Sequence, residues 1–257
     1  MSSPIQPALA KKLKVLDLFS GIGGFSLGLE RTGGFQTVAF CEIEPFPRRV
    51  LAKHWPEVPC YDDVRTLTAE RLAADGIAVD VICGGFPCQD LSRAGYGAGI
   101  GGDRSGLWDE YARLIGEIQP RFCIVENVAG LLDGGMGVVL GDLAALGYDA
   151  DWGCVRASDV GLPHERERVW IVAYPASLGQ PEPGHAWAFA RNCAPCGDWK
   201  ASHAVDALRR GAVPALCREH DGVSARLAGP RLTALGNAVV PQIPEIIGRA
   251  ILQAVAA

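Results

Sequence analysis

Short apolar runs alternate with segments of helical spacing over the first two thirds of the chain. Apolar runs of about four to eight residues indicate buried strands, and recurrence at helical spacing indicates amphipathic helices. The strands predicted in this way cover residues 14–19, 37–43, a short stretch near Cys60, 79–86, 122–127, 152–157 and 169–173. The predicted helices cover residues 25–31, 45–55, 68–75, 107–118, 138–146 and 245–255. Strands separated by such helices predict an α/β fold with a doubly wound, mostly parallel, Rossmann-like sheet.

The pattern breaks between Pro175 and Leu235, where periodicity is weak and Pro, Gly, Trp and Arg are concentrated. Helical spacing returns only near the C-terminus. We therefore expect a large domain, residues 1–174 completed by 236–257, and a small irregular second domain at 175–235.

Composition narrows the class of protein. Of the 257 residues, 49% are hydrophobic and 21% charged, which is typical of a globular domain. Because no apolar run approaches the ~20 residues of a membrane span and no signal peptide is visible, we expect a cytoplasmic protein without membrane contact. The nine cysteines are then expected to be reduced thiols.

The net charge of −5 argues weakly against nucleic acid as a partner. The distribution of basic residues is compatible with a nucleic-acid partner, because ten of the eleven basic residues after residue 150 are arginine. Arginine is suited to bidentate contacts with phosphate and guanine.

Cys88 is the strongest candidate for a nucleophile. It stands in the run Gly84-Gly85-Phe86-Pro87-Cys88-Gln89, at the end of a predicted buried strand and before a glycine-rich loop. Cysteine attacks through its thiolate, which backbone N–H groups or nearby cations stabilise. The alternative is a cysteine that only fills space in the core.

A glycine turn follows the first predicted strand, in the run Asp17 to Gly24. Such a turn lets a ligand approach the backbone closely, but the dinucleotide fingerprint would require glycine where this chain has Ser26. Glu42 ends the second strand, where a carboxylate can bind ribose hydroxyls, and Asp63 could accept from an adenine amino group. Together they fit an adenosine ligand without a pyrophosphate, such as S-adenosylmethionine. A strand–helix turn without a ligand is the alternative.

Two further polar groups fall at strand ends. Glu126 ends the fifth predicted strand, where a buried carboxylate is costly unless it is paired or protonated, and a capping role is the alternative. Arg166 and Arg168 enter a strand two residues apart, so both can face the same crevice. Surface ion pairs are the alternative for these arginines.

With these pieces in order, the chain resembles the bacterial and phage DNA (cytosine-5-)-methyltransferases. The resemblance rests on segments that lie within residues 13–174 and 231–256. They are Asp17 to Gly24, Glu42, Asp63, Phe86-Pro87-Cys88-Gln89, Glu126-Asn127-Val128, Arg166-x-Arg168 and Leu235-Gly236-Asn237-Ala238-Val239-Val240-Pro241.

The resemblance implies a catalytic and cofactor-binding domain with the S-adenosylmethionine-dependent methyltransferase fold, and a target recognition domain at 175–235. The Cys88 thiolate would attack carbon 6 of a flipped-out cytosine in duplex DNA. Glu126 would hydrogen-bond the ring, and Arg166 and Arg168 would support it. Ser92 matches the family's serine in the glycine-rich segment 89–104, which is similar to the closing loop of the family.

The resemblance also implies a binding site for S-adenosylmethionine made by residues from several segments. Those residues are Phe19, Gly21, Gly23, Gly24, Glu42, Ile43, Asp63, Val64, Pro87, Leu107, Asn237 and Ala238.

A structural zinc site is a minor alternative for the second domain. Cys193, Cys196, Cys217 and His220 have ligand-like spacing, although the family does not generally require zinc and isolated pairs of this kind are often unrelated to metal. We therefore expect no metal.

The expected function is site-specific DNA cytosine methylation, with double-stranded DNA as partner, a monomeric protein and, where a restriction system exists, a cognate endonuclease. Three alternatives stay open: an RNA cytosine carbon-5 methyltransferase on the same fold, a non-catalytic DNA-binding relative, and a nicotinamide oxidoreductase, which Ser26 disfavours.

Overall fold

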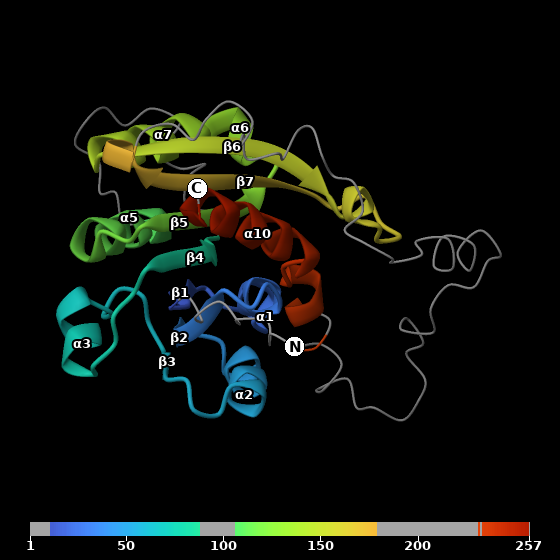
Figure 1. Ribbon diagram of the computed structural model, residues 1–257. Helices are drawn as coiled ribbons and strands as arrows, with labels where there is room; N and C mark the ends of the chain where they lie inside the picture. The colour runs from blue at the N-terminus through green and yellow to red at the C-terminus, as the bar shows by residue number, and fades with distance from the viewer. Residues whose placement is uncertain (1–10, 88–105, 179–230, 232, 257) are drawn as a thin grey trace, which may run out of the picture.

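Seven strands form one sheet in the order β3-β2-β1-β4-β5-β7-β6 (Figure 1). The computed structural model describes residues 11–87, 106–178, 231 and 233–256. The strands are β1 (Leu13–Leu18), β2 (Phe35–Cys41), β3 (Cys60–Tyr61), β4 (Val81–Gly85), β5 (Phe122–Val128), β6 (Tyr148–Arg156) and β7 (Glu167–Pro175). Each predicted strand is present, and the predicted α/β class is confirmed.

The sheet is parallel from β3 to β5, whereas β7 is antiparallel to both of its neighbours, β5 and β6. Only residues 157–166 join β6 to β7, including the short helix η2 (Ala157–Val160). This link lacks the crossover helix that a parallel neighbour needs, so the chain turns back on itself. β6 begins four residues before the predicted strand because Asp149 and Asp151, which interrupt the apolar pattern, still pair along the backbone.

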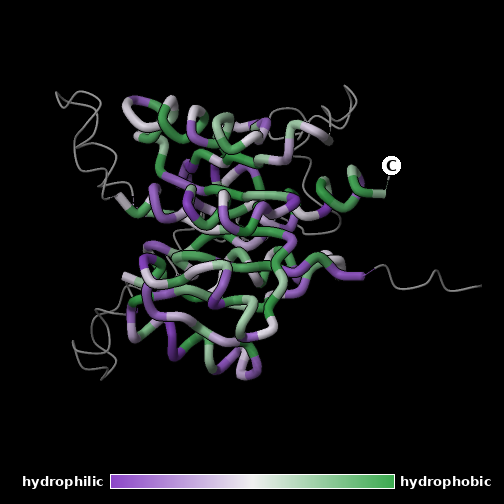
Figure 2. Tube along the Cα trace, turned by 90° about the vertical axis from the view of Figure 1, so that its left-hand side faces the viewer, coloured by the Kyte–Doolittle hydropathy of each residue, from purple (hydrophilic) through white to green (hydrophobic). Residues whose placement is uncertain are grey.

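Two layers of helices cover the sheet. The helices are α1 (Gly24–Arg31), α2 (Pro45–His54), α3 (Ala69–Ala74), α5 (Leu107–Ile118), α6 (Leu131–Gly134), α7 (Met136–Ala145) and α10 (Gln242–Ala256), with the short helix η3 (Ala176–Leu178) after β7. Apolar residues of α1 and α10 form one core cluster with the sheet, and those of α3, α5, α6 and α7 form the other. Figure 2 shows hydrophobic segments running through the middle of the molecule.

The C-terminal helix packs closely on the first helix. A Cβ at Gly24 would lie 2.6 Å from the carbonyl oxygen of Val239, and one at Gly28 would overlap that of Pro241. A Cβ at Gly248 of α10 would lie 3.1 Å from the Leu29 side chain. Glycine in these positions removes side-chain bulk and lets the two backbones approach. The segment that begins at Val239 and the helix that follows it are therefore in tight contact with α1.

The predicted second domain, 175–235, lies for the most part outside the described residues. Its proposed first residue, Pro175, is the last residue of β7. Among the described residues, no helix is both long and apolar enough to cross a membrane.

The α1–α10 contact gives a test of packing. We expect Gly28→Ala to lower the free energy of unfolding by about 1–3 kcal/mol, because the added methyl would overlap backbone that cannot move freely. Gly141→Ala is the matched control, since Gly141 lies in the interior of α7 with open space around it and alanine favours a helix by up to about 1 kcal/mol. Urea unfolding of the two variants measures the difference. Equal stability would contradict the proposed tight contact.

Candidate active site

A buried ion pair lies at the carboxyl end of β5. Glu126 is 9% exposed, and its Oε1 atom lies 3.0 Å from Nε of Arg168. In the antiparallel pairing of β5 and β7, Arg168 is the register partner of Val128. Its side chain contacts Glu126, which is the diagonal neighbour two residues before Val128 on β5. Burial raises the pKa of Glu126, and the charges of Arg168 and Arg166 oppose that rise. Burial and the two arginines thus act on the protonation of this carboxyl group in opposite directions.

Gly85 leaves the space that the Glu126 carboxylate occupies. The two residues are register partners at the ends of the parallel strands β4 and β5. A Cβ at Gly85 would lie 2.5 Å from Oε2 of Glu126. Any larger residue would push the carboxylate away or shift the strand.

Asn127 holds the chain that leads toward Cys88. Its buried Nδ2 donates a 3.0 Å hydrogen bond to the carbonyl oxygen of Phe86, and its Oδ1 accepts from the backbone N–H of Val128 at 2.8 Å. Phe86 is itself buried against Trp108, with ring centroids 5.2 Å apart. The backbone two residues before Cys88 is therefore fixed on both sides.

Cys88 and Ser92 lie outside the described residues. Pro87, which precedes Cys88, is exposed. Arg166 lies one residue before β7 and donates through Nη1 to the carbonyl oxygen of Gly236. This bond brings the C-terminal segment that contains Asn237 and Ala238 to the same edge of the sheet; Asn237 is exposed and Ala238 half-buried.

The glycine turn after β1 surrounds a second buried carboxylate. Glu42 is 8% exposed; its Oε2 accepts from the Gly21 N–H at 2.7 Å, and its Oε1 accepts from the Glu44 N–H at 2.8 Å. Phe19 has a positive φ of 51°, and its ring stacks on Tyr111 at 6.4 Å. Backbone donors thus hold Glu42 rigidly beside the turn.

The three glycines of the turn have different surroundings. A Cβ at Gly21 would meet no atom within 4 Å, so its backbone is open to a ligand. One at Gly23 would lie 2.7 Å from the Trp55 ring, and Gly24 packs on Val239. Gly23 and Gly24 therefore serve packing, and Gly21 alone fits the close approach expected of a ligand-binding turn.

The remaining predicted cofactor residues come from other segments of the chain. Ile43 is 60% exposed, Val64 is buried, and Leu107 is half-buried at the start of α5. Asp63 is held by Arg65 through a bidentate pair with distances from 2.7 to 3.1 Å. Hydrogen bonds from Arg65 hold the pKa of Asp63 below its ordinary value, so the carboxylate stays an acceptor.

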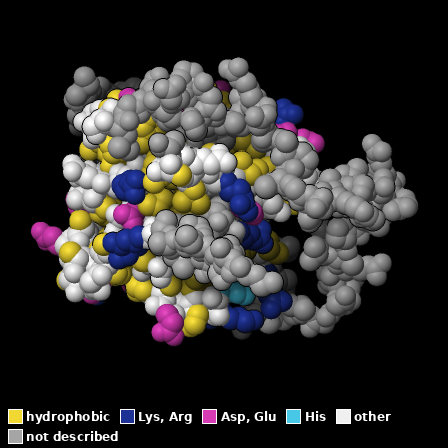
Figure 3. Space-filling view, viewed as in Figure 1, with side chains coloured by type: hydrophobic (Ala, Val, Ile, Leu, Met, Phe, Trp, Pro, Cys, Tyr) yellow, Lys and Arg dark blue, Asp and Glu magenta, His cyan; other side chains and the backbone are white. Residues whose placement is uncertain are grey.

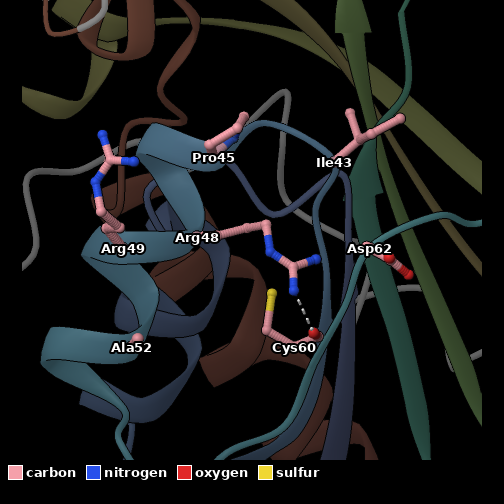
Figure 4. Close-up of a pocket in the computed structure, with 7 residues that line it drawn as sticks. All are labelled: Ile43, Pro45, Arg48, Arg49, Ala52, Cys60 and Asp62. Carbon is pink, nitrogen blue, oxygen red and sulfur yellow. Dashed lines mark hydrogen bonds between the residues drawn. The ribbon is translucent and has the colours of Figure 1, made fainter.

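A cavity of about 520 Å³ adjoins this region, between α2 and β3 (Figure 4). The residues that line it are Ile43, Pro45, Arg48, Arg49, Ala52, Cys60 and Asp62.

One protein family matches much of the chain. The pattern of the family described as C-5 cytosine-specific DNA methylase matches residues 13–192, more than half of the chain. The chain belongs to this family. The match includes the glycine turn, Glu42, Asp63, the Cys88 motif, Glu126 and both arginines.

Two bacterial methyltransferases are among the proteins to which the chain is similar. The chain is 38% identical over 169 residues to the type II methyltransferase M2.BsuMI of Bacillus subtilis, covering 63% of this chain and 42% of that protein. It is 32% identical over 176 residues to M1.ScrFI of Lactococcus lactis, covering 67% of this chain and 44% of that protein. The chain thus spans less than half the length of these relatives.

Solved structures support the fold of the methylase. One is a crystal structure titled as a DNA modification methyltransferase encoded within an E. coli prophage. It is 32% identical with a TM-score of 0.55, covering 65% of this chain and 48% of that one. A Spodoptera frugiperda DNMT2 structure has a TM-score of 0.56 at 23% identity, covering 66% of this chain and 52% of that one, and supports the fold alone.

No group of three or more His, Cys, Asp or Glu side chains within the described residues is placed to hold a metal ion. The zinc candidates Cys193, Cys196, Cys217 and His220 lie outside those residues.

Sequence reasoning gave no role to Gly85 or Asn127, although both stand inside quoted motifs. A glycine pair at the end of a strand is a signal of close backbone or side-chain approach, and it could have identified Gly85. The partner of Asn127 is a backbone carbonyl, which leaves no mark in the sequence.

Asp17 is the third buried carboxyl group of this region, after Glu126 and Glu42. The sequence indicated no separate role for it. It is fully buried beneath α1; Oδ2 accepts a 2.7 Å hydrogen bond from Oγ of Ser26, and Oδ1 has no hydrogen-bond partner among the described residues. Burial raises the pKa of Asp17 to about 8; the Ser26 hydrogen bonds oppose this rise, and the Glu42 charge adds to it. Ser26, which argued against a dinucleotide site, thus has a structural role.

Asp17 should make stability depend on pH. In the unfolded chain this acid ionises near 3.8, whereas in the folded protein it stays neutral up to about 8. Unfolding between these values releases a proton, so stability should fall by up to about 1.4 kcal/mol per pH unit as the pH rises through this range. Asp17→Asn cannot ionise, so its free energy of unfolding does not change in this way. The difference in this free energy between the variant and the wild type should therefore shift in favour of the variant from about pH 5 to about pH 8. Chemical unfolding of both proteins across this range measures the difference, and parallel pH profiles would show that Asp17 is already ionised when folded.

Proposed function

We propose that this protein transfers a methyl group from S-adenosylmethionine to carbon 5 of a flipped-out cytosine in duplex DNA, through a covalent bond to Cys88. The observation that carries the proposal is the buried Glu126–Arg168 pair, which lies beside the strand end that leads into Cys88. The type II methyltransferases to which the chain is similar support the choice of reaction.

Cys88 would supply the nucleophile. Its thiolate attacks carbon 6 of the base, a sulfur–carbon bond forms, and electron density moves toward carbon 5. Carbon 5 would then take the methyl group, and S-adenosylhomocysteine would be the leaving group. Carbon 5 would next lose its proton to a general base, the double bond between carbons 5 and 6 would form again, and the sulfur–carbon bond would break to release the thiolate. Each bond made to Cys88 is thus broken within one turnover.

Glu126 would stabilise the charge that develops on the ring. A carboxyl group with a raised pKa can keep a proton shared with the ring nitrogen N3, and its other oxygen can accept from the exocyclic amine. Arg168 holds the carboxyl in place at 3.0 Å, so no rearrangement is needed when the base arrives. Arg166 adds positive potential at the same edge.

The residues around the glycine turn fit S-adenosylmethionine, which supplies an electrophilic methyl group. Glu42 presents a buried carboxylate for the ribose hydroxyls, and Gly21 leaves its backbone open. Phe19 and Ile43 would flank the adenine, and Asp63 would accept from its amino group in exchange for part of its pairing with Arg65.

DNA is the proposed macromolecular substrate, with residues 175–235 as its recognition segment. Figure 3 shows Lys and Arg side chains in separate groups on one face, several of them beside acidic side chains, rather than as one continuous basic surface. We propose that DNA binding depends largely on the recognition segment. A monomer in the cytoplasm, with or without a restriction endonuclease of the same site, is the expected setting.

The first test uses labelled S-adenosylmethionine with duplex DNA and with RNA. The wild type should label DNA at cytosine, whereas Cys88→Ala should lose at least about a thousandfold in rate because no covalent step is possible. If the protein labels RNA but not DNA, its substrate is RNA. Equal labelling by the alanine variant would remove Cys88 from the mechanism.

The covalent step has a test of its own. Fluorine at carbon 5 cannot leave as a proton does, so DNA containing 5-fluorocytosine at the methylated site should trap the protein through Cys88. A band that survives denaturation on a gel, and is missing for Cys88→Ala, is the expected result. Absence of any adduct on DNA that the enzyme methylates would contradict covalent attack.

The position of the Glu126 carboxylate can be tested through its neighbour. Gly85→Ala should lower kcat by about ten- to a hundredfold, with little change in KM for S-adenosylmethionine, because the methyl displaces Glu126 and leaves the glycine turn untouched. Gly134→Ala, a glycine with open space around it, is the control and should retain activity. A kcat for Gly85→Ala within about twofold of the wild type would contradict the importance of this contact.

A further inference from the structure

The segment between β3 and α3 has little support from the sheet. β3 contains only two residues, and it pairs with β2 through the N–H groups of Phe40 and Glu42, each 2.9 Å from its acceptor. The chain then leaves the sheet, yet it includes Asp63, which the proposed function assigns to the adenine, and Val64, which is expected in the same cofactor site. Something other than strand pairing must fix these residues, because a ligand wall that moves loses affinity.

Arg48 of α2 holds the first part of this segment. Its Nη1 donates to the carbonyl oxygen of Glu42 at 3.0 Å, and its Nη2 donates to that of Cys60 at 3.2 Å. Figure 4 shows the guanidinium reaching across the cavity toward Cys60. One side chain thus connects the residue proposed to bind ribose with the strand that leads to Asp63.

Arg113 of α5 holds the second part. Its Nη2 donates to the carbonyl oxygens of Val64 and Leu67, at 3.0 and 2.9 Å. Its other nitrogens pair with Glu110 at 2.7 Å and Glu117 at 2.6 Å, which fix the guanidinium on the surface of α5.

Glu117 extends the same contact to the next element. Its second carboxylate oxygen accepts from the N–H of Ala69, the first residue of α3, at 3.0 Å. The Arg113–Glu117 pair therefore binds three backbone groups of one segment, and α5 also carries Leu107, which is proposed to line the cofactor site.

We infer that Arg48 and Arg113 are positioning residues for the adenosine half of S-adenosylmethionine, each bridging two backbone carbonyls of the segments that would contact it. The inference rests on the proposed function of this site. Both guanidinium groups are occupied by protein acceptors, so their action is through Glu42, Asp63 and Val64 and not by direct contact. A planar guanidinium can serve two acceptors at once in a fixed geometry, which a lysine ammonium on a flexible chain does poorly.

Loss of either arginine should change KM for S-adenosylmethionine and leave kcat nearly unchanged. Arg48→Ala and Arg113→Ala should each raise KM for S-adenosylmethionine by about tenfold or more, while kcat at saturating cofactor and the Kd for DNA change by less than about threefold. Arg48→Lys and Arg113→Lys should recover only part of the loss. Guanidinium ion at low, non-denaturing concentration should lower the KM of the alanine variants and leave the wild type unchanged.

Two controls separate positioning from a general loss of stability. Arg249→Ala removes an arginine that pairs with Glu245 on the surface of α10, and KM should not change. Leu143→Ala removes a fully buried side chain of α7 and should destabilise the protein by about 2–5 kcal/mol. At a temperature where Leu143→Ala remains folded, its KM for S-adenosylmethionine should equal that of the wild type.

The outcomes distinguish this inference from the proposed function. A wild type that does not bind S-adenosylmethionine in calorimetry overturns both. A wild type that binds it, with folded arginine variants whose KM is unchanged or rises no more than that of Leu143→Ala, overturns the positioning role alone. A raised KM with partial recovery by lysine and by guanidinium supports it.

Discussion

The Glu126 carboxylate can be buried at the edge of the sheet only because a cation meets it there, and the direction of β7 supplies that cation. Arg168 is the second residue of β7, and Glu126 lies near the end of β5. In antiparallel strands the start of one lies beside the end of the other, so the pair forms at 3.0 Å. If β7 were parallel to β5, its first residues would lie at the opposite edge and Glu126 would be buried without a partner, at a cost of several kcal/mol.

The same edge gathers the other groups of the site. Gly85 ends the strand on the other side of Glu126, and Asn127 ties β5 to the backbone of Phe86. Arg166, just outside β7, reaches the C-terminal segment at Gly236. Three strands and a distant segment of the chain therefore converge on one carboxyl group, and the position of each depends on the register of its neighbours.

Much of the fold could be predicted from the chain because the relevant signals are local. Apolar runs and helical spacing identified the strands, the helices and the α/β class. The antiparallel direction of β7 was not predicted, although the short connection from β6 favours it. The roles of the three turn glycines could not be predicted. Gly23 packs on Trp55 and Gly24 on Val239, whereas Gly21 has open space beside it. Trp55 and Val239 are distant in the sequence, so the local sequence does not distinguish the three glycines.

Some residues of the candidate site could be predicted from the sequence and others could not. Glu42, Glu126 and Arg168 could be singled out because a charged residue at either end of an apolar strand is conspicuous, and their roles stay predictions. Arg48 and Arg113 were missed because their partners are backbone carbonyls, and any residue can supply a carbonyl. The roles of Cys88 and Ser92 remain predictions from the sequence.

The packing of α10 on α1 has a consequence for synthesis on the ribosome. Phe25 and Leu29 of the first helix share a core cluster with Ile243, Ile247 and Ile251 of the last one. A chain made from its N-terminus must therefore expose that apolar surface until residues 243–251, which cover it, have been made. The nascent protein is open to aggregation and to chaperone binding throughout this interval, because α1 lacks the helix that covers it.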